Sequence, residues 1–159
     1  MNKRYEDLFQ KLIYKGEKTM KDCIVRLTVI KNLAKDIHYN SHGEAFYGIH
    51  LLMDRVADGL DQYVDDIKEN LYLGWHNTPP SSKEIFKIAE AMMPELDHSD
   101  NLSMIRVLRD FISGTLENIC ELVQNTTILM NGDIALLDDI SKDLRKKIGL
   151  LNCTLSEIA

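Results

Sequence analysis

The chain has few residues that interrupt helices. Its 159 residues include 8 glycines and 3 prolines, fewer than the roughly 12% of Gly and Pro found in average soluble proteins. Sandwiches and barrels of short strands need frequent turns, and turns draw heavily on these two residues. The shortage therefore favours long helices over an all-β fold.

Long uncharged apolar runs are also missing. A membrane-spanning helix needs about 18 or more such residues in succession, and no segment of the sequence supplies them. The N-terminal segment MNKRYEDLFQKL is charged and amphipathic, and it lacks the apolar centre of a secretory signal peptide. We therefore expect a cytoplasmic protein that has no membrane contact.

Cysteine is scarce as well. Cys23, Cys120 and Cys153 are an odd number, lie far apart and form no C-x-x-C pair, so neither a disulfide framework nor a zinc site is indicated. Each lies in or beside a periodic apolar stretch. The sequence predicts three buried thiols.

Positive charge is in deficit. The chain has 19 Lys and Arg against 25 Asp and Glu, which gives a formal net charge of −6. Binding to the phosphates of nucleic acids requires clustered cations. Only Lys3 and Arg4 precede the point where Tyr5 and Glu6 begin an amphipathic pattern. DNA binding is thus possible but not favoured.

Apolar residues recur at intervals of three and four in four long segments, the pattern of amphipathic helices. The expected inward residues of the first two are Met20, Ile24, Leu27, Ile30, Ala34, Ile37, Phe46, Ile49, Met53, Val56, Ala57, Leu60, Val64, Ile67 and Leu71. The other two helices direct Ile105, Leu108, Ile112, Leu116, Ile119, Val123, Leu137, Ile140, Leu144, Ile148, Leu151 and Leu155 inward.

Capping residues and breakers predict where these helices begin and end. The first spans about residues 17–38, after a short helical arm at 1–16. The second runs from a capping box at 41–44 to Gly74, the third follows Ser99 or Asp100, and the fourth begins at Asp133. A short helix, 83–92, lies between a second capping box at 81–84 and Pro94. The sequence thus predicts a single all-α domain over 1–159, a four-helix bundle with a short helix in its long middle crossover.

Two pairs of metal-competent side chains lie on one border of the second predicted helix. His50 and Asp54 are four residues apart, as are Asp65 and Glu69, so each pair occupies adjacent turns. The pairs are centred about 22 Å apart on a straight helix and cannot share an ion within one chain. Two copies packed antiparallel about a two-fold axis would bring the first pair of each chain to the second pair of the other. His38 is a fifth candidate if the first two helices form a hairpin.

The same residues carry a resemblance to a known family. The segment HYNSHGEAF at 38–46 resembles the H-W-N-x-x-G-x-x-F motif of the DNA-protection-during-starvation (Dps) mini-ferritins, with Tyr39 in place of tryptophan. The segments IHLLMD at 49–54 and DDIKE at 65–69 resemble the family's V-H-x-x-L/F-D and D-x-x-A-E, although Asn70 follows where arginine is common. The successive ligand spacings of 12, 4, 11 and 4 residues also agree.

The resemblance implies a ferritin-like fold and a ferroxidase centre at each two-fold interface. His38, His50 and Asp54 of one subunit and Asp65 and Glu69 of its mate would bind iron. Such proteins oxidise Fe(II), preferably with hydrogen peroxide rather than oxygen, and store ferric oxide in a hollow homododecamer of tetrahedral symmetry, which protects against oxidative damage. Iron enters such shells through acidic pores, for which Asp133, Asp138 and Asp139 are candidates. These three also fit helix-start aspartates favoured by the helix dipole.

Two alternatives remain open at the level of sequence. The chain could be a Dps-fold DNA-binding or assembly protein without significant ferroxidase activity, in which many weak tails act together. It could also be a monomeric bundle whose acidic strip is only solvated and whose histidines are structural.

Overall fold

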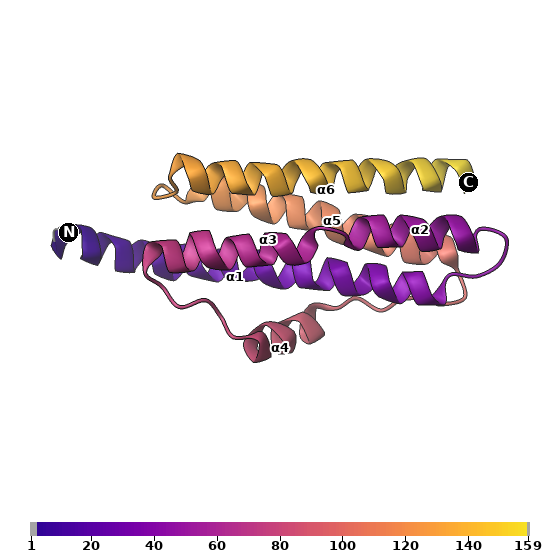
Figure 1. Ribbon diagram of the computed structural model, residues 1–159, viewed down its shortest axis with the longest axis horizontal. Helices are drawn as coiled ribbons and strands as arrows, with labels where there is room; N and C mark the ends of the chain where they lie inside the picture. The colour runs from indigo at the N-terminus through magenta and orange to yellow at the C-terminus, as the bar shows by residue number, and fades with distance from the viewer. Residues whose placement is uncertain (1–2, 159) are drawn as a thin grey trace.

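The computed structural model describes the backbone of residues 3–158 and the side chains of residues 20–156, and within this range every regular element is helical (Figure 1). The elements are α1 (Lys3–Asn40), α2 (Phe46–Ala57), α3 (Leu60–Asp66), the π-helix η1 (Ile67–Tyr72), the 3₁₀ turn η2 (Leu73–Trp75), α4 (Ser82–Met92), α5 (Asn101–Asn125) and α6 (Asn131–Ile158). None of the described helices combines the length and apolarity that a membrane span requires.

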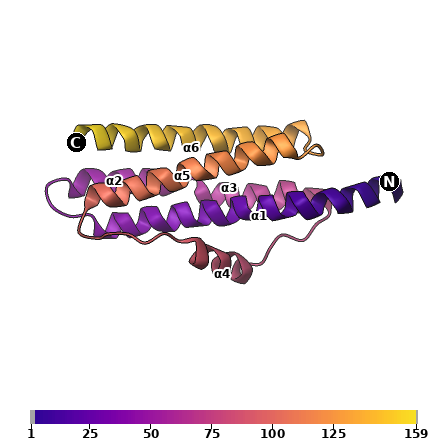
Figure 2. The ribbon, with the colours of Figure 1, turned by 180° about the vertical axis from the view of Figure 1, so that it is seen from behind.

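The long helices form a bundle in which α1 runs antiparallel to the α2–α3 segment and α5 runs antiparallel to α6 (Figures 1 and 2). After α3 the chain returns along the length of the bundle before α5 begins, and α4 lies in this connection, against the outside of α1 (Figure 1). The predicted all-α bundle with a crossover helix is confirmed. Residues 3–16, predicted as an arm, continue α1 in the backbone, and their side chains lie outside the described part.

The core is centred on α1, which contacts α2, α3, α4 and α5. All six of its predicted inward residues are buried. Val25, Val29 and Leu33, which lie off that stripe, are buried as well. A helix with neighbours on several sides needs apolar side chains around most of its circumference, so α1 is more apolar than a single stripe predicts.

The second predicted helix is not continuous. It begins at Phe46 rather than at the predicted capping box, and it breaks at Asp58 and Gly59, whose backbone angles are extended and left-handed (Gly59 φ +78°). After α3 the helix widens into η1 and tightens into η2, and it ends at Trp75 rather than at Gly74, with His76 as a left-handed C-cap. The two halves of the predicted site therefore lie on separate helical segments.

Two of the three predicted caps are confirmed. The Ser81 hydroxyl accepts a hydrogen bond from the Glu84 amide (3.2 Å), and the Asp100 carboxylate accepts from the first amides of α5. The cap at Ser41 is wrong. The Ser41 amide donates to the Ile37 carbonyl (2.8 Å) and so ends α1, and its buried hydroxyl oxygen has no hydrogen-bond partner among the described residues.

The prediction of three buried thiols is correct only for Cys23. Cys120 and Cys153 are exposed, because they lie on the outer faces of α5 and α6 beside the apolar stripes rather than within them. Burial raises the pKa of Cys23 to about 12. Since the thiolate is the reactive form, Cys23 should be inert in the folded chain.

We expect a thiol reagent such as 5,5′-dithiobis(2-nitrobenzoate) to label Cys120 and Cys153 in the native protein and Cys23 only after denaturation. The release of thionitrobenzoate would then rise to two equivalents per chain, with a third in guanidinium chloride. A Cys23→Ala variant should lose only the third equivalent. Equal labelling of three thiols in the native wild-type protein would contradict the assignment.

Candidate metal centre

The hairpin of α1 and α2 brings two histidines into contact. The rings of His38 and His50 stack with their centroids 3.5 Å apart and an interplanar angle of 26°. The Nδ1 of each ring lies 3.0 Å from the backbone carbonyl oxygen of the other residue. The last carbonyls of a helix lack partners within the helix, so the His50 ring also satisfies the end of α1.

These contacts determine which ring nitrogens could bind a metal. A carbonyl oxygen can only accept, so Nδ1 of each ring carries the hydrogen and donates it. In a neutral imidazole the lone pair is then on Nε2. Histidines that ligate metals usually donate their other ring N–H to a carbonyl or a carboxylate in this way. Both rings are therefore oriented and in the tautomer that leaves Nε2 free.

Asp54 completes a group of three. One donor atom from each of His38, His50 and Asp54 lies within 4.8 Å of the others, and no other such group of three occurs among the described side chains. His38 is buried, His50 is half-buried and Asp54 is exposed. His38 Nδ1 also lies 3.3 Å from Asp54 Oδ1. The structure thus places these three residues together, and their nitrogen and oxygen donors suit Fe(II).

Lys35 is a member of this site that the sequence analysis missed. Its Nζ lies 2.6 Å from Asp54 Oδ1. The hydrogen bond from Lys35 lowers the pKa of Asp54 and raises that of Lys35 itself. Asp54 is therefore ionised, as a metal ligand must be, and a metal ion would compete with the ammonium group. The spacing of Lys31, Lys35 and His38 along one face of α1 was the available signal.

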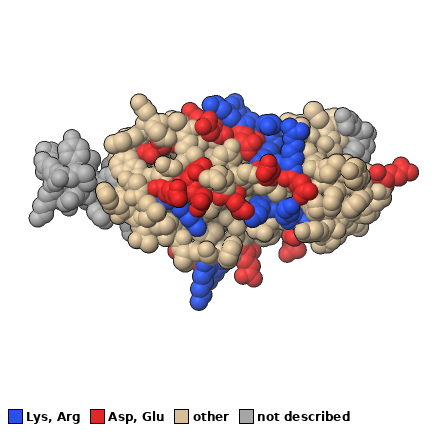
Figure 3. All heavy atoms as spheres, in the orientation of Figure 1, with Lys and Arg blue, Asp and Glu red and all other residues tan. Residues whose placement is uncertain are grey.

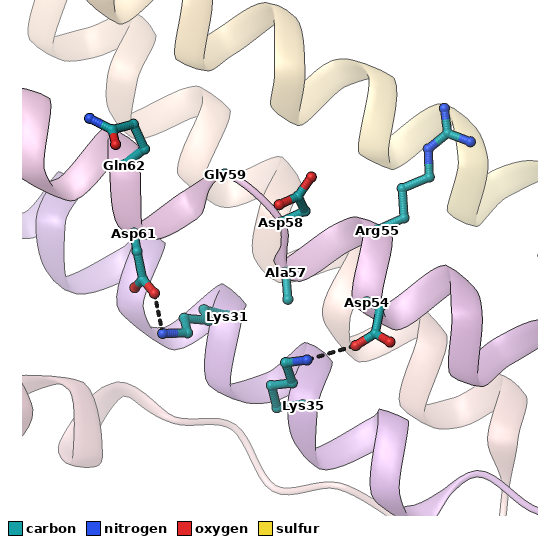
Figure 4. Close-up of a pocket in the computed structure, with 9 residues that line it drawn as sticks. All are labelled: Lys31, Lys35, Asp54, Arg55, Ala57, Asp58, Gly59, Asp61 and Gln62. Atoms are coloured by element: carbon teal, nitrogen blue, oxygen red, sulfur yellow. Dashed lines mark hydrogen bonds and ion pairs between the residues drawn. The ribbon is translucent and has the colours of Figure 1, made fainter.

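A polar cleft of about 810 Å³ opens beside Asp54, at the break between α2 and α3 (Figure 4). Two ion pairs span it from α1, Lys35 with Asp54 and Lys31 with Asp61. Arg55, Ala57, Asp58, Gly59 and Gln62 line the rest. The carboxylate of the candidate centre is therefore reached from an open, charged groove.

The second predicted pair does not join this group within the chain. Asp65 lies in α3 and Glu69 in η1, both exposed. Neither carboxylate has a hydrogen bond or an ion pair among the described residues. Their contribution to a centre on a two-fold mate remains a prediction.

The three candidate pore residues differ in their surroundings. Asp133 is buried and accepts hydrogen bonds from the Met130 amide (2.9 Å) and from Trp75 Nε1 (3.4 Å). It therefore caps the start of α6 and ties that end to η2. Asp138 and Asp139 are exposed, and Asp139 pairs with Lys142. The pore itself is a prediction about an assembly.

Aromatic side chains surround the candidate centre. Phe46, predicted to face the core, is 39% exposed, and its ring centroid lies 5.0 Å from that of His50. Tyr39 meets His38 edge to face at 4.9 Å. Tyr39, Tyr47 and Leu51 are all at least half exposed. The prediction for Phe46 is wrong because α2 begins at that residue, where the hairpin leaves the bundle.

Comparisons with known proteins place this geometry in a structural context. No protein-family model and no curated protein sequence matches the chain. Solved structures do match. A Dps from Mycobacterium smegmatis lacking its C-terminus is 16% identical, with a TM-score of 0.76 over 89% of this chain and 99% of that one.

Two further Dps structures agree. Dps92 of Deinococcus radiodurans is 17% identical, with a TM-score of 0.77 over 90% of this chain and 87% of that one. The Dps protein of Vibrio cholerae O1, described as a member of the ferritin-like diiron-carboxylate superfamily, is 20% identical, with a TM-score of 0.72 over 91% of each chain. The chain therefore has the ferritin-like fold of the Dps proteins.

Proposed function

We propose that the chain is the subunit of a cytoplasmic Dps-type ferroxidase and iron-storage shell. It oxidises Fe(II), with hydrogen peroxide as the preferred oxidant, and holds the ferric product inside a hollow dodecamer. The observation that carries the proposal is the convergence of His38, His50 and Asp54, with both imidazoles in the tautomer that leaves Nε2 free. The Dps fold supports it.

Iron is the substrate of the proposed reaction. Two Fe(II) ions each give one electron to hydrogen peroxide, the O–O bond breaks, and two protons complete two water molecules. The imidazole nitrogens suit Fe(II), and the hard carboxylate oxygens stabilise the Fe(III) that forms. Because peroxide is consumed as a two-electron oxidant, hydroxyl radical is not released. Oxidation in this shell would thus protect the cell.

A second copy of the chain supplies the remaining ligands in this proposal. Asp65 and Glu69 are exposed carboxylates without partners in the described chain. Tyr39, whose ring meets that of His38, is exposed, as are Tyr47 and Leu51 of α2, and aromatic side chains are enriched at the centres of protein interfaces. Both observations support a two-fold interface that covers the centre.

The net charge of the chain does not favour DNA binding as the main function. On the face in Figure 3, the basic side chains that gather along one edge of the bundle have acidic side chains beside them. The net charge of each chain is −6, and assembly multiplies that repulsion. Lys3 and Arg4 lie outside the described side chains.

We expect His50→Ala and Asp54→Asn to weaken anaerobic Fe(II) binding by about tenfold or more, because even supporting residues of metal sites contribute about ten- to a hundredfold. Peroxide-dependent formation of the ferric absorbance should slow in parallel. Isothermal titration and stopped-flow absorbance would measure the two effects.

Asp61→Asn is the matched control. It removes an equivalent ion pair, with Lys31, from the same cleft but leaves the three ligands untouched. It should bind and oxidise iron as the wild type does. Tight Fe(II) binding that survives both ligand substitutions, or no ferric product from the wild type, would refute the ferroxidase proposal.

Mixing two inactive variants tests the intersubunit centre. His38→Ala with His50→Ala removes one half of every centre, and Asp65→Ala with Glu69→Ala removes the other half. In a mixed dimer, one centre lacks both halves and the other is intact. Random pairing of equal amounts should therefore restore about a quarter of the wild-type centres, measured as iron oxidised in the first seconds after peroxide addition.

The two variants are mixed while unfolded and then refolded together, and light scattering confirms a mass near twelve chains. Each variant refolded alone is the control and should stay inactive. If the mixture is as inactive as its components while a wild-type sample refolded in the same way is active, the centre is not shared between chains.

A further inference from the structure

The helix that carries both predicted half-sites is broken between them. His50 and Asp54 lie in α2, and Asp65 and Glu69 lie in α3 and η1. A continuous helix would fix their separation and relative rotation at about 1.5 Å and 100° per residue. Asp58 (φ −62°, ψ 139°) and Gly59 (φ +78°, ψ −11°) depart from that geometry. The relation between the halves is therefore set at this break.

A buried lysine from another helix holds the break. Lys147 of α6 is 3% exposed, and its Nζ donates to the Asp58 carbonyl (2.8 Å) and to Asp143 Oδ2 (2.6 Å). A buried ammonium is unfavourable unless it is paired and hydrogen-bonded. The carbonyls at the end of a helix likewise need a partner. The Lys147 ammonium group and the Asp58 carbonyl thus satisfy each other's hydrogen bonding, although they are 89 residues apart in sequence.

Gly59 allows the backbone to take this path. Its positive φ is one that glycine adopts freely and that asparagine tolerates, whereas alanine strongly prefers the helix. A Cβ at this position would have no heavy atom within 4 Å. A substitution there acts through the backbone conformation, without a clash.

We propose that Gly59 and Lys147 are positioning residues that set the register between the two halves of the metal centre. The proposal rests on the proposed function and deepens it. In a two-fold dimer each chain gives one half to each of two centres. Both ligand sets can be completed only if the separation and rotation between the two half-sites of one chain match the geometry of the dimer. The break at Asp58 and Gly59 sets this separation and rotation, and the hydrogen bond from Lys147 maintains them.

Gly59→Ala and Gly59→Asn are the decisive pair. Anaerobic titration with Co(II), a redox-stable probe with visible absorption, gives the affinity and the number of sites per chain. We expect Gly59→Ala to lose tight binding by about tenfold or more, the effect of a displaced supporting group, while a weak site from His38, His50 and Asp54 persists. Gly59→Asn should stay close to the wild type.

Lys147→Met provides an independent test of the role of the Lys147 hydrogen bond. Lys142→Met, on the exposed side of the same helix, is its control. Lys147→Met should lose tight Co(II) binding as Gly59→Ala does, and Lys142→Met should not. Circular dichroism establishes that each variant is folded. If Lys147→Met does not fold, the Gly59 pair decides.

The outcomes separate the two proposals. If the wild type binds no Co(II) and no Fe(II), the proposed function fails and the positioning roles fail with it. If the wild type binds tightly and Gly59→Ala binds with the same affinity and stoichiometry, the register proposal alone is overturned. Equal losses in Gly59→Ala and Gly59→Asn would also overturn it, because asparagine should preserve the break.

Discussion

The exchange of hydrogen bonds between His38 and His50 is the interaction on which the candidate centre depends. Each ring donates to the other residue's backbone carbonyl, so the end of α1 and the first turns of α2 are joined by the side chains that, in our proposal, bind the metal through their other nitrogens. The same contact closes the hairpin, satisfies the last turn of α1 and selects the tautomer. Loss of either ring would therefore disturb both the local fold and the chemistry.

The periodicity of apolar residues predicted the bundle, since burial of a stripe is a local property of each helix. It did not predict the break at Asp58 and Gly59. An aspartate and a glycine on the polar side of a helix are compatible with a continuous segment, at some loss of stability. What favours the break is the partner of the Asp58 carbonyl, Lys147, which lies far away in sequence. A tertiary contact of this kind is invisible to patterns within one helix.

Among the caps and ligands, too, local sequence patterns predicted some features and not others. Identical S-x-x-E patterns at 41–44 and 81–84 gave one wrong cap and one correct cap, because α1 extends through Asn40 and takes the Ser41 amide for its own last turn. The spacing of His38, His50 and Asp54 predicted their meeting, since a tight hairpin places residues 38 and 50 opposite each other. The sequence did not show that Lys35 reaches Asp54, although the two lie on facing helices.

The Lys35–Asp54 ion pair can keep a ligand carboxylate ionised and still available to a metal ion. Clustered carboxylates repel one another and attract any available cation, yet a ligand must be free when iron arrives. An ammonium group partly exposed to solvent holds Asp54 ionised and oriented, and partly exposed pairs are weak, so a divalent ion can displace it. Asp65 and Glu69 have no such partner within the described part of the chain and lie beyond the break. The chain therefore balances the charge of the half-site that it completes by itself and leaves unbalanced the half-site that, in our proposal, a second chain completes. In that proposal, a bound metal ion would supply the positive charge that the second half-site lacks.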